Sequence, residues 1–206
     1  MRHLIDFGDL SRAEWDALYH RCSEMIDHPA DFLDVCRGKV MASLFYEPST
    51  RTNFSFQTAM LRVGGTVFGF ADPNSSSVAK GETLKDTIKM VSGYADVVVM
   101  RNPLEGAAKA ASLYSDVPVI NAGDGGHMHP TQTTADLTTI TRLRGRIDGL
   151  SIGLCGDLKN GRTVHSLIKA MAKFSGIKFF LIAPRELAIP AYMRAFLREN
   201  GMWFTE

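Results

Sequence analysis

The chain has 206 residues, 45% of them hydrophobic and 22% charged, which suits a globular protein with one large or two small domains. Lys and Arg (23) almost balance Asp and Glu (22), so the formal net charge is +1. This balance excludes a global basic field that would attract nucleic acid or an anionic membrane. Any anion-binding site must therefore be local.

The sequence predicts a cytoplasmic protein that does not enter a membrane. The longest apolar runs, such as residues 97–100, are too short to cross a bilayer, and the N-terminus becomes charged too early for a secretory signal. The three cysteines, Cys22, Cys36 and Cys155, are odd in number and lack CxxC spacing. We expect them to be buried small hydrophobic side chains and not a disulfide framework.

Strand and helix patterns alternate along the chain. A capping box of Ser11 and Glu14 opens the first helix. Short apolar runs predict strands at 39–46, 66–71, 96–102, 117–122, 151–157, 178–183 and from 203. Helical spacing predicts helices after 11, from 49, from 82, and at 106–115, 130–145, 163–174 and 191–200.

This order predicts an α/β fold with two domains, each with a parallel β-sheet flanked by helices. We expect a first domain at 1–130, a connecting helix at 131–147 and a partial second domain at 148–206. The second domain is expected to be incomplete, because a parallel sheet that stops at its third strand leaves apolar faces uncovered.

The turn after the first strand carries hydroxyls and a guanidinium into the first turn of a helix: Ser49, Thr50, Arg51 and Thr52. The backbone N–H groups at a helix start have no intrahelical partner, and Arg matches phosphate bidentately. The pattern indicates an anion site. The alternative is that Ser49 only caps the helix.

Two further segments offer cationic groups. Arg101 ends the apolar strand 96–102, at the edge where ligands gather in open α/β sheets. The loop 72–81 combines a serine cluster with Lys80 and is a candidate lid. The alternatives are an ordinary surface ion pair for Arg101 and a solvated surface loop for 72–81.

A glycine-rich segment around Asp124, His127 and His129 precedes the helix at 130–145. A zinc site is disfavoured, because no third His or Cys follows at ligand spacing. We expect His129 to donate a hydrogen bond to a carbonyl oxygen while its other ring nitrogen is held by a neighbour.

The loop at 156–165 repeats the pattern of residues 49–52, because Arg162 and Thr163 again stand at a helix start. It predicts a second anion site. His165, in the same turn, is expected to be a packing residue. Since cationic groups recur at strand edges of a chain with balanced charge, one pocket for anionic small substrates is the simplest interpretation. No nucleophile with a paired base is evident.

Five motifs occur in order: FYEPSTRT (45–52), SSSVAKGE (75–82), VVMRNP (98–103), HPTQT (129–133) and GDLKNGRTVHS (156–166). With them the chain resembles the aspartate/ornithine transcarbamylase family, and the fifth motif is similar to its aspartate branch. For carbamoyl phosphate the resemblance implies Ser49, Thr50, Arg51, Thr52, Ser76, Arg101, His129 and Gln132. It implies Lys80 and Arg162 for aspartate, and Thr52, Arg101 and His129 as catalytic residues that polarise the carbamoyl oxygen.

The resemblance implies transfer of the carbamoyl group to L-aspartate in pyrimidine biosynthesis, with no metal or cofactor. It also implies a homotrimer in which Ser76 and Lys80 reach the neighbouring subunit's site, with regulatory chains as further partners. The family's second domain extends well beyond the position of Glu206, so we expect a fragment or a chain completed by a partner. The alternatives are a non-catalytic carbamoyl-phosphate-binding subunit and a transcarbamylase for a different amine.

Overall fold

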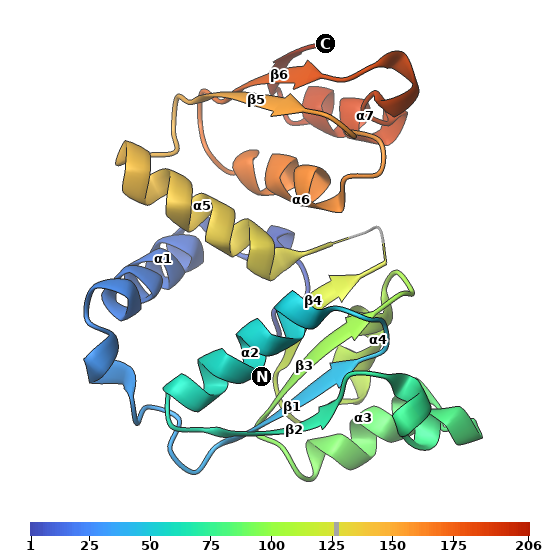
Figure 1. The fold of residues 1–206 in the computed structure, drawn as a ribbon. Coiled ribbons are helices and arrows are strands. Elements are labelled where there is room, and N and C mark those ends of the chain that lie inside the picture. Colours follow the sequence, from blue (N-terminus) through green and yellow to red (C-terminus); the bar gives the residue numbers. More distant parts are fainter. Residues whose placement is uncertain (126–127) are drawn as a thin grey trace. The chain divides into compact units, whose positions relative to one another are not determined.

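The computed structural model describes residues 1–125 and 128–206 (Figure 1). Contacts between Cα atoms divide the chain into two compact units. The first consists of Met1–Asp6 and His20–Gly125, and the second of Phe7–Tyr19 and Gly126–Glu206. The domain limits expected from the sequence, with a connecting helix at 131–147, stay a prediction.

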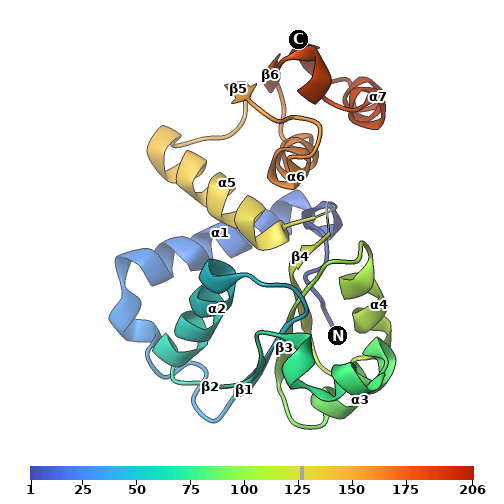
Figure 2. The same cartoon turned by 45° about the vertical axis from the view of Figure 1, so that its right-hand side comes forward.

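The first unit is built on a four-stranded parallel sheet in the order β2-β1-β3-β4. Its strands are β1 (Val40–Phe45), β2 (Thr66–Phe70), β3 (Val97–Asn102) and β4 (Val119–Asp124). Its helices are α2 (Thr50–Arg62), α3 (Leu84–Ser92) and α4 (Ala107–Tyr114). Helix α2 covers one face of the sheet, and α3 and α4 cover the other (Figures 1 and 2).

The alternation of side chains along β1 supplies both layers of this core. Met41 and Phe45 pack with Met60 of α2, whereas Leu44 packs on the opposite face with Ile88 of α3. Phe45, Leu44 and Ile88 are no more than 1% exposed. Burial of each such side chain contributes about 1.5–3 kcal/mol. Strand β3 is likewise buried on both faces, as its run of valines predicts.

The second unit contains a three-stranded parallel sheet in the order β5-β6-β7. Its strands are β5 (Ser151–Cys155), β6 (Lys178–Ile182) and β7 (Trp203–Thr205), and its helices include α5 (Pro130–Arg144), α6 (Arg162–Met171) and α7 (Ala191–Glu199). Helices α6 and α7 lie on the same side of the sheet (Figure 1). Short 3-10 helices of the two units cover Phe7–Asp9 (η1), Pro29–Phe32 (η2), Pro73–Ser75 (η3), Ser77–Lys80 (η4) and Arg185–Leu187 (η5).

The second sheet is buried on one face and open on the other. Phe179 of β6 is fully buried with the core of α6 and α7, but Phe180 and Ile182 are 39% and 56% exposed. Trp203 of β7 is 49% exposed. Cys155 is also exposed, so the prediction that it is buried was wrong. The reason is tertiary, since its strand lies in a sheet with helices on a single face.

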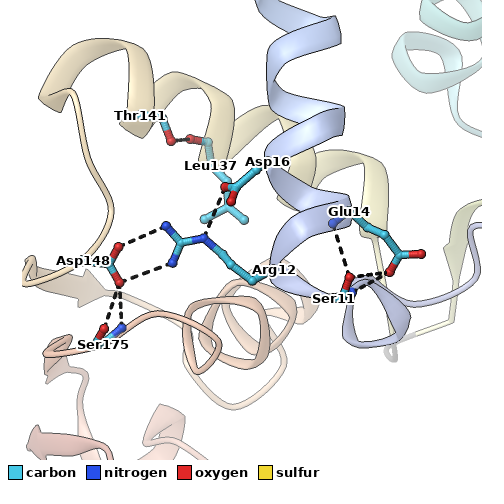
Figure 3. Close-up of polar contacts among 8 residues, drawn as sticks. All are labelled: Ser11, Arg12, Glu14, Asp16, Leu137, Thr141, Asp148 and Ser175. Atoms are coloured by element: carbon cyan, nitrogen blue, oxygen red, sulfur yellow. Dashed lines mark hydrogen bonds and ion pairs between the residues drawn. The ribbon is translucent and has the colours of Figure 1, made fainter.

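Helix α1 (Arg12–Asp27) starts with the predicted capping box (Figure 3). The Ser11 hydroxyl accepts a hydrogen bond from the Glu14 backbone N–H at 3.3 Å, and the Glu14 carboxylate accepts from the Ser11 N–H at 2.7 Å. The two bonds satisfy N–H groups that a helix start otherwise leaves without partners.

An ion pair holds the first turn of α1 in the second unit (Figure 3). The Arg12 guanidinium donates to Asp148 at 3.1 Å and lies 4.3 Å above the ring of Phe174. Asp148 also accepts from the backbone N–H of Ser175 at 2.8 Å. Residues 7–19 thus belong to the second unit, although the sequence places them before every strand of the first.

The α/β class with two parallel sheets flanked by helices is confirmed. The predicted strands and helices are all present, with ends shifted by a few residues. Within residues 1–125 and 128–206, no helix is both long enough and apolar enough to cross a membrane.

Candidate active site

The turn between β1 and α2 presents the predicted anion-binding groups at the start of a helix. Ser49 occupies the N-cap position, but its side chain makes no capping hydrogen bond. Thr50, Arg51 and Thr52 form the first turn of α2 and contain no acidic residue. The explanation that Ser49 only caps the helix is therefore not supported.

A buried asparagine fixes this helix start to the sheet. Asn53 is 4% exposed, and its carbonyl oxygen accepts hydrogen bonds from the Ser43 hydroxyl at 2.9 Å and the Gln57 amide at 2.7 Å. Ser43 lies on β1 and Gln57 one turn further along α2. Buried polar groups with satisfied partners hold the backbone in one arrangement, so the anion-binding turn is rigidly supported.

Arg101 meets this turn at the carboxyl edge of the same sheet. It pairs in register with Phe45, the last residue of β1, and its carbonyl accepts from the Tyr46 N–H at 2.8 Å. The order of the sheet reverses between β1 and β3, and ligands of open α/β sheets bind at this switch point.

The guanidinium of Arg101 donates through Nε to the Glu47 carboxylate at 2.6 Å. The two side chains are only 11% and 24% exposed, so this is a largely buried pair and not the ordinary surface pair that we considered. Glu47 lies in the turn itself, between Tyr46 and Pro48. A negative charge therefore stands beside the proposed anion site before any ligand binds.

The loop after β2 folds into η3 and η4. Ser76 is the N-cap of η4: its hydroxyl donates to the Pro73 carbonyl at 2.8 Å and accepts from the Val78 N–H at 3.3 Å. Lys80 is exposed in the last turn of η4, and Gly81 follows with φ +90°. Both predicted residues of this loop are thus carried on one short ordered segment.

In the second unit, His129 is the N-cap of α5. Its backbone N–H donates to the Ser166 hydroxyl of α6 at 3.3 Å, and Thr131 Oγ1 lies 3.4 Å from ring atom Nδ1. If Thr131 donates to Nδ1, the proton is on Nε2, which is the arrangement expected for a neutral imidazole that donates to a carbonyl oxygen.

Gln132 and Arg162 complete the predicted residues of this unit. Gln132 lies in the first turn of α5, is exposed, and donates through Nε2 to Asp136 at 2.8 Å. Arg162 is the first residue of α6 and is half-buried. Because Ser166 is one turn beyond Arg162, its bond to His129 places the starts of α5 and α6 next to each other.

His165 has the packing role expected from the sequence. It is 4% exposed, and its Nε2 lies 2.8 Å from the Leu158 carbonyl oxygen. A carbonyl can only accept, so Nε2 carries the proton and Nδ1 accepts from the Tyr192 hydroxyl at 2.8 Å. The side chain ties the loop before α6 to helix α7.

Asp124 ends β4 with a buried carboxylate that is held by protein groups. Its carboxylate is 1% exposed and accepts from the Gly106 backbone N–H at 3.0 Å and the Asn121 amide at 3.1 Å. His127 lies outside the described residues. Among those that are described, no three His, Cys, Asp or Glu side chains form a group that could hold a metal ion.

The structure therefore brings the predicted residues together within each unit. Ser49, Thr50, Arg51, Thr52 and Arg101 share one sheet edge of the first unit, and His129, Gln132 and Arg162 share two adjoining helix starts of the second. The sequence did not single out Glu47 or Asp136. Only the second had a readable signal, its four-residue spacing from Gln132 on a predicted helix.

Comparison with known proteins agrees with this geometry. Residues 2–142 match the family described as "Aspartate/ornithine carbamoyltransferase, carbamoyl-P binding domain". The chain is 56% identical over all its 206 residues to the aspartate carbamoyltransferase catalytic subunit of Clostridium perfringens. It is 57% identical to that of Clostridium botulinum, and covers 67% of each of these relatives.

Solved structures show the same fold. The catalytic subunit of M. jannaschii aspartate transcarbamoylase superposes with a TM-score of 0.92 at 49% identity, covering 99% of this chain and 67% of that one. Trypanosoma cruzi aspartate transcarbamoylase, in complex with carbamoyl phosphate and aspartate, gives 0.89 at 39% identity, with 98% and 69% covered. This chain covers about two thirds of the length of these solved chains, which agrees with the expected partial second domain. The chain belongs to the aspartate/ornithine carbamoyltransferase family.

Proposed function

We propose that this chain transfers the carbamoyl group of carbamoyl phosphate to the amine of L-aspartate, giving N-carbamoyl-L-aspartate and phosphate. The observation that carries the proposal is the register of β1 and β3, which brings Arg101 to the turn that holds Ser49–Thr52. The match of residues 2–142 to a carbamoyl-phosphate-binding domain family supports carbamoyl phosphate as the ligand of this site. The two relatives at 56% and 57% identity are aspartate carbamoyltransferase catalytic subunits, which favours aspartate as the acceptor.

In the first unit, we assign the phosphate to Ser49, Thr50, Arg51, Thr52 and Arg101. The N–H groups at the start of α2 and the two guanidinium groups supply positive potential, and the hydroxyls orient the phosphate oxygens. Ser76 and Lys80 of the η4 segment are proposed to act in the site of a neighbouring subunit. That assignment depends on a homotrimer, which is itself part of the proposal.

We assign His129, Thr52 and Arg101 as donors to the carbamoyl oxygen, as the resemblance to the family implies. Gln132 binds the carbamoyl amine, and Arg162 binds a carboxylate of aspartate. The uncharged amine of aspartate attacks the carbamoyl carbon, the donors stabilise the oxyanion that forms, and phosphate departs as the carbon–oxygen bond breaks. The leaving phosphate accepts the proton that the amine nitrogen of aspartate loses once the carbon–nitrogen bond has formed. No redox change occurs, and no step of the scheme is routed through a cofactor.

The test is formation of carbamoyl aspartate by the purified chain with carbamoyl phosphate and L-aspartate, and with L-ornithine as the alternative amine. Product with aspartate alone is the expected result. Arg51→Gln is a suitable inactive control, because Arg51 is exposed and its removal should leave the fold intact. Product with ornithine alone would refute the assignment of the acceptor.

Binding of carbamoyl phosphate without turnover would instead favour a non-catalytic binding subunit. This second candidate gains weight from one observation: the apolar side chains on the open face of the β5-β6-β7 sheet, Phe180, Ile182 and Trp203. Light scattering of the same sample would test the homotrimer. Regulatory chains and the cytoplasmic location stay predictions.

A further inference from the structure

A second carboxylate contact lies inside the proposed substrate-binding helix and has no role in the scheme above. On α5, Gln132 Nε2 donates a hydrogen bond of 2.8 Å to Oδ1 of Asp136. The residues are four positions apart, so their side chains share one face of the helix. Among the described residues, Gln132 is the hydrogen-bond partner of this carboxylate.

The chemistry of this bond selects one orientation of the glutamine side chain. A primary amide has a donor end, the NH₂ group, and an acceptor end, the carbonyl oxygen, and the two are almost equal in size. An ionised carboxylate can only accept. Asp136 therefore holds the NH₂ end of Gln132, and the carbonyl oxygen Oε1 is the end turned away from it.

The environment of Asp136 sets this contact apart from a simple helix-surface pair. Asp136 is half-buried, and burial raises the pKa of its carboxyl group. The hydrogen bond from Gln132 acts in the opposite direction, because it favours the ionised form. Partial burial of a carboxylate costs free energy, and a pair whose role was only to stabilise the helix would not need that cost.

We propose that Asp136 is a positioning residue that presents Gln132 Oε1 to the carbamoyl amino group and thereby distinguishes carbamoyl phosphate from acetyl phosphate. This inference rests on the proposed function, in which Gln132 meets that amino group. Carbamoyl phosphate carries an NH₂ group at the position where acetyl phosphate carries a methyl group. The Gln132 carbonyl oxygen would accept a hydrogen bond from the carbamoyl NH₂ group. A flipped Gln132 amide would instead place its own NH₂ group, a second donor, against it.

The experiment compares dissociation constants of carbamoyl phosphate, acetyl phosphate and inorganic phosphate, measured by calorimetry on the full chain. The variant Asp136→Asn keeps the size of the side chain but can face Gln132 with either end of its own amide. We expect its preference for carbamoyl over acetyl phosphate to fall by about three- to tenfold, the value of one hydrogen bond. The dissociation constant of inorganic phosphate should be unchanged.

Two further variants separate positioning from stability. Asp136→Glu retains a carboxylate and should restore most of the preference. Thr139→Ala, on the same helix, removes an exposed hydroxyl that bonds the Ala135 carbonyl and should change none of the three constants. Circular dichroism of each variant checks that α5 remains folded.

The outcomes are distinguishable. An unchanged preference in Asp136→Asn, or an equal loss of affinity for all three ligands, would overturn the positioning role. Failure of the unmodified chain to bind carbamoyl phosphate would overturn the proposed function and this inference with it. A selective loss of the preference, restored by Asp136→Glu, supports both.

Discussion

Replacing Glu47 with Gln is expected to strengthen phosphate binding at the edge shared by β1 and β3. Glu47 bonds Arg101 through Nε at 2.6 Å, which leaves the two terminal amino groups of the fork to hold an anion bidentately. A phosphate held there would face the Glu47 carboxylate across the guanidinium, at roughly 7 Å. The carboxylate thus repels the ligand that Arg101 attracts.

The structure sets the size of this repulsion. Two unit charges roughly 7 Å apart interact by about 0.6 kcal/mol in water and about 2.4 kcal/mol at an effective dielectric constant near 20. The side chains of Arg101 and Glu47 are 11% and 24% exposed, so the higher value is the better guide. Since about 1.4 kcal/mol corresponds to tenfold in affinity, about 2.4 kcal/mol means that Glu47→Gln should lower the phosphate dissociation constant by about fiftyfold.

Titration calorimetry with inorganic phosphate at constant ionic strength measures this effect. The Gln amide oxygen can still accept from Arg101 Nε, so the loss of unfolding free energy should be limited to about 1–2 kcal/mol. Asp116→Asn is the matched control: it also removes one negative charge, but from an exposed pair with Lys89 just before β4, away from the carboxyl edge. A phosphate affinity in Glu47→Gln that equals or falls below that of the unmodified chain would refute the reasoning.

Three further changes test the site and the second unit. His129→Ala should reduce turnover about a hundredfold or more, with a much smaller effect on carbamoyl phosphate binding, because an oxyanion donor acts mainly in the transition state; unchanged turnover in steady-state assays would remove His129 from the mechanism. Phe7→Ala should lower the free energy of unfolding by about 3–5 kcal/mol in urea titrations, since Phe7 is 2% exposed in the core of the second unit; a loss below about 1 kcal/mol would contradict this packing. Hydrogen bonding from Arg12 lowers the pKa of Asp148 in the folded chain, so its contribution to stability is present above the unfolded-state pKa and is lost as pH falls through the folded-state value. Asp148→Asn should therefore be less stable than the unmodified chain at neutral pH, and a gap in thermal midpoint that does not shrink as the pH is lowered below about 4 would argue against the pair.

Local sequence signals predicted the elements of this fold because each signal depends on neighbouring residues. The capping box at Ser11 and Glu14 satisfies N–H groups of its own helix start. The valine run in β3 is buried on both faces because helices follow the strands on either side of the sheet. The candidate anion site at Ser49–Thr52 was predicted for the same reason, since a helix start, its hydroxyls and its Arg are consecutive in the chain.

Contacts between distant segments could not be read in the same way. The pairing of Glu47 with Arg101 depends on β1 and β3 being neighbours in register, although 54 positions separate the two residues. The assignment of residues 7–19 to the second unit depends on Phe7 and Trp15 packing into its core, and on Arg12 reaching Asp148 across 136 positions. Composition and periodicity carry no information on such partners. The sequence alone thus predicted which chemical groups stand at each strand end. Strand order, helix docking and the burial of charges depend on packing, and they decide which of those groups act together.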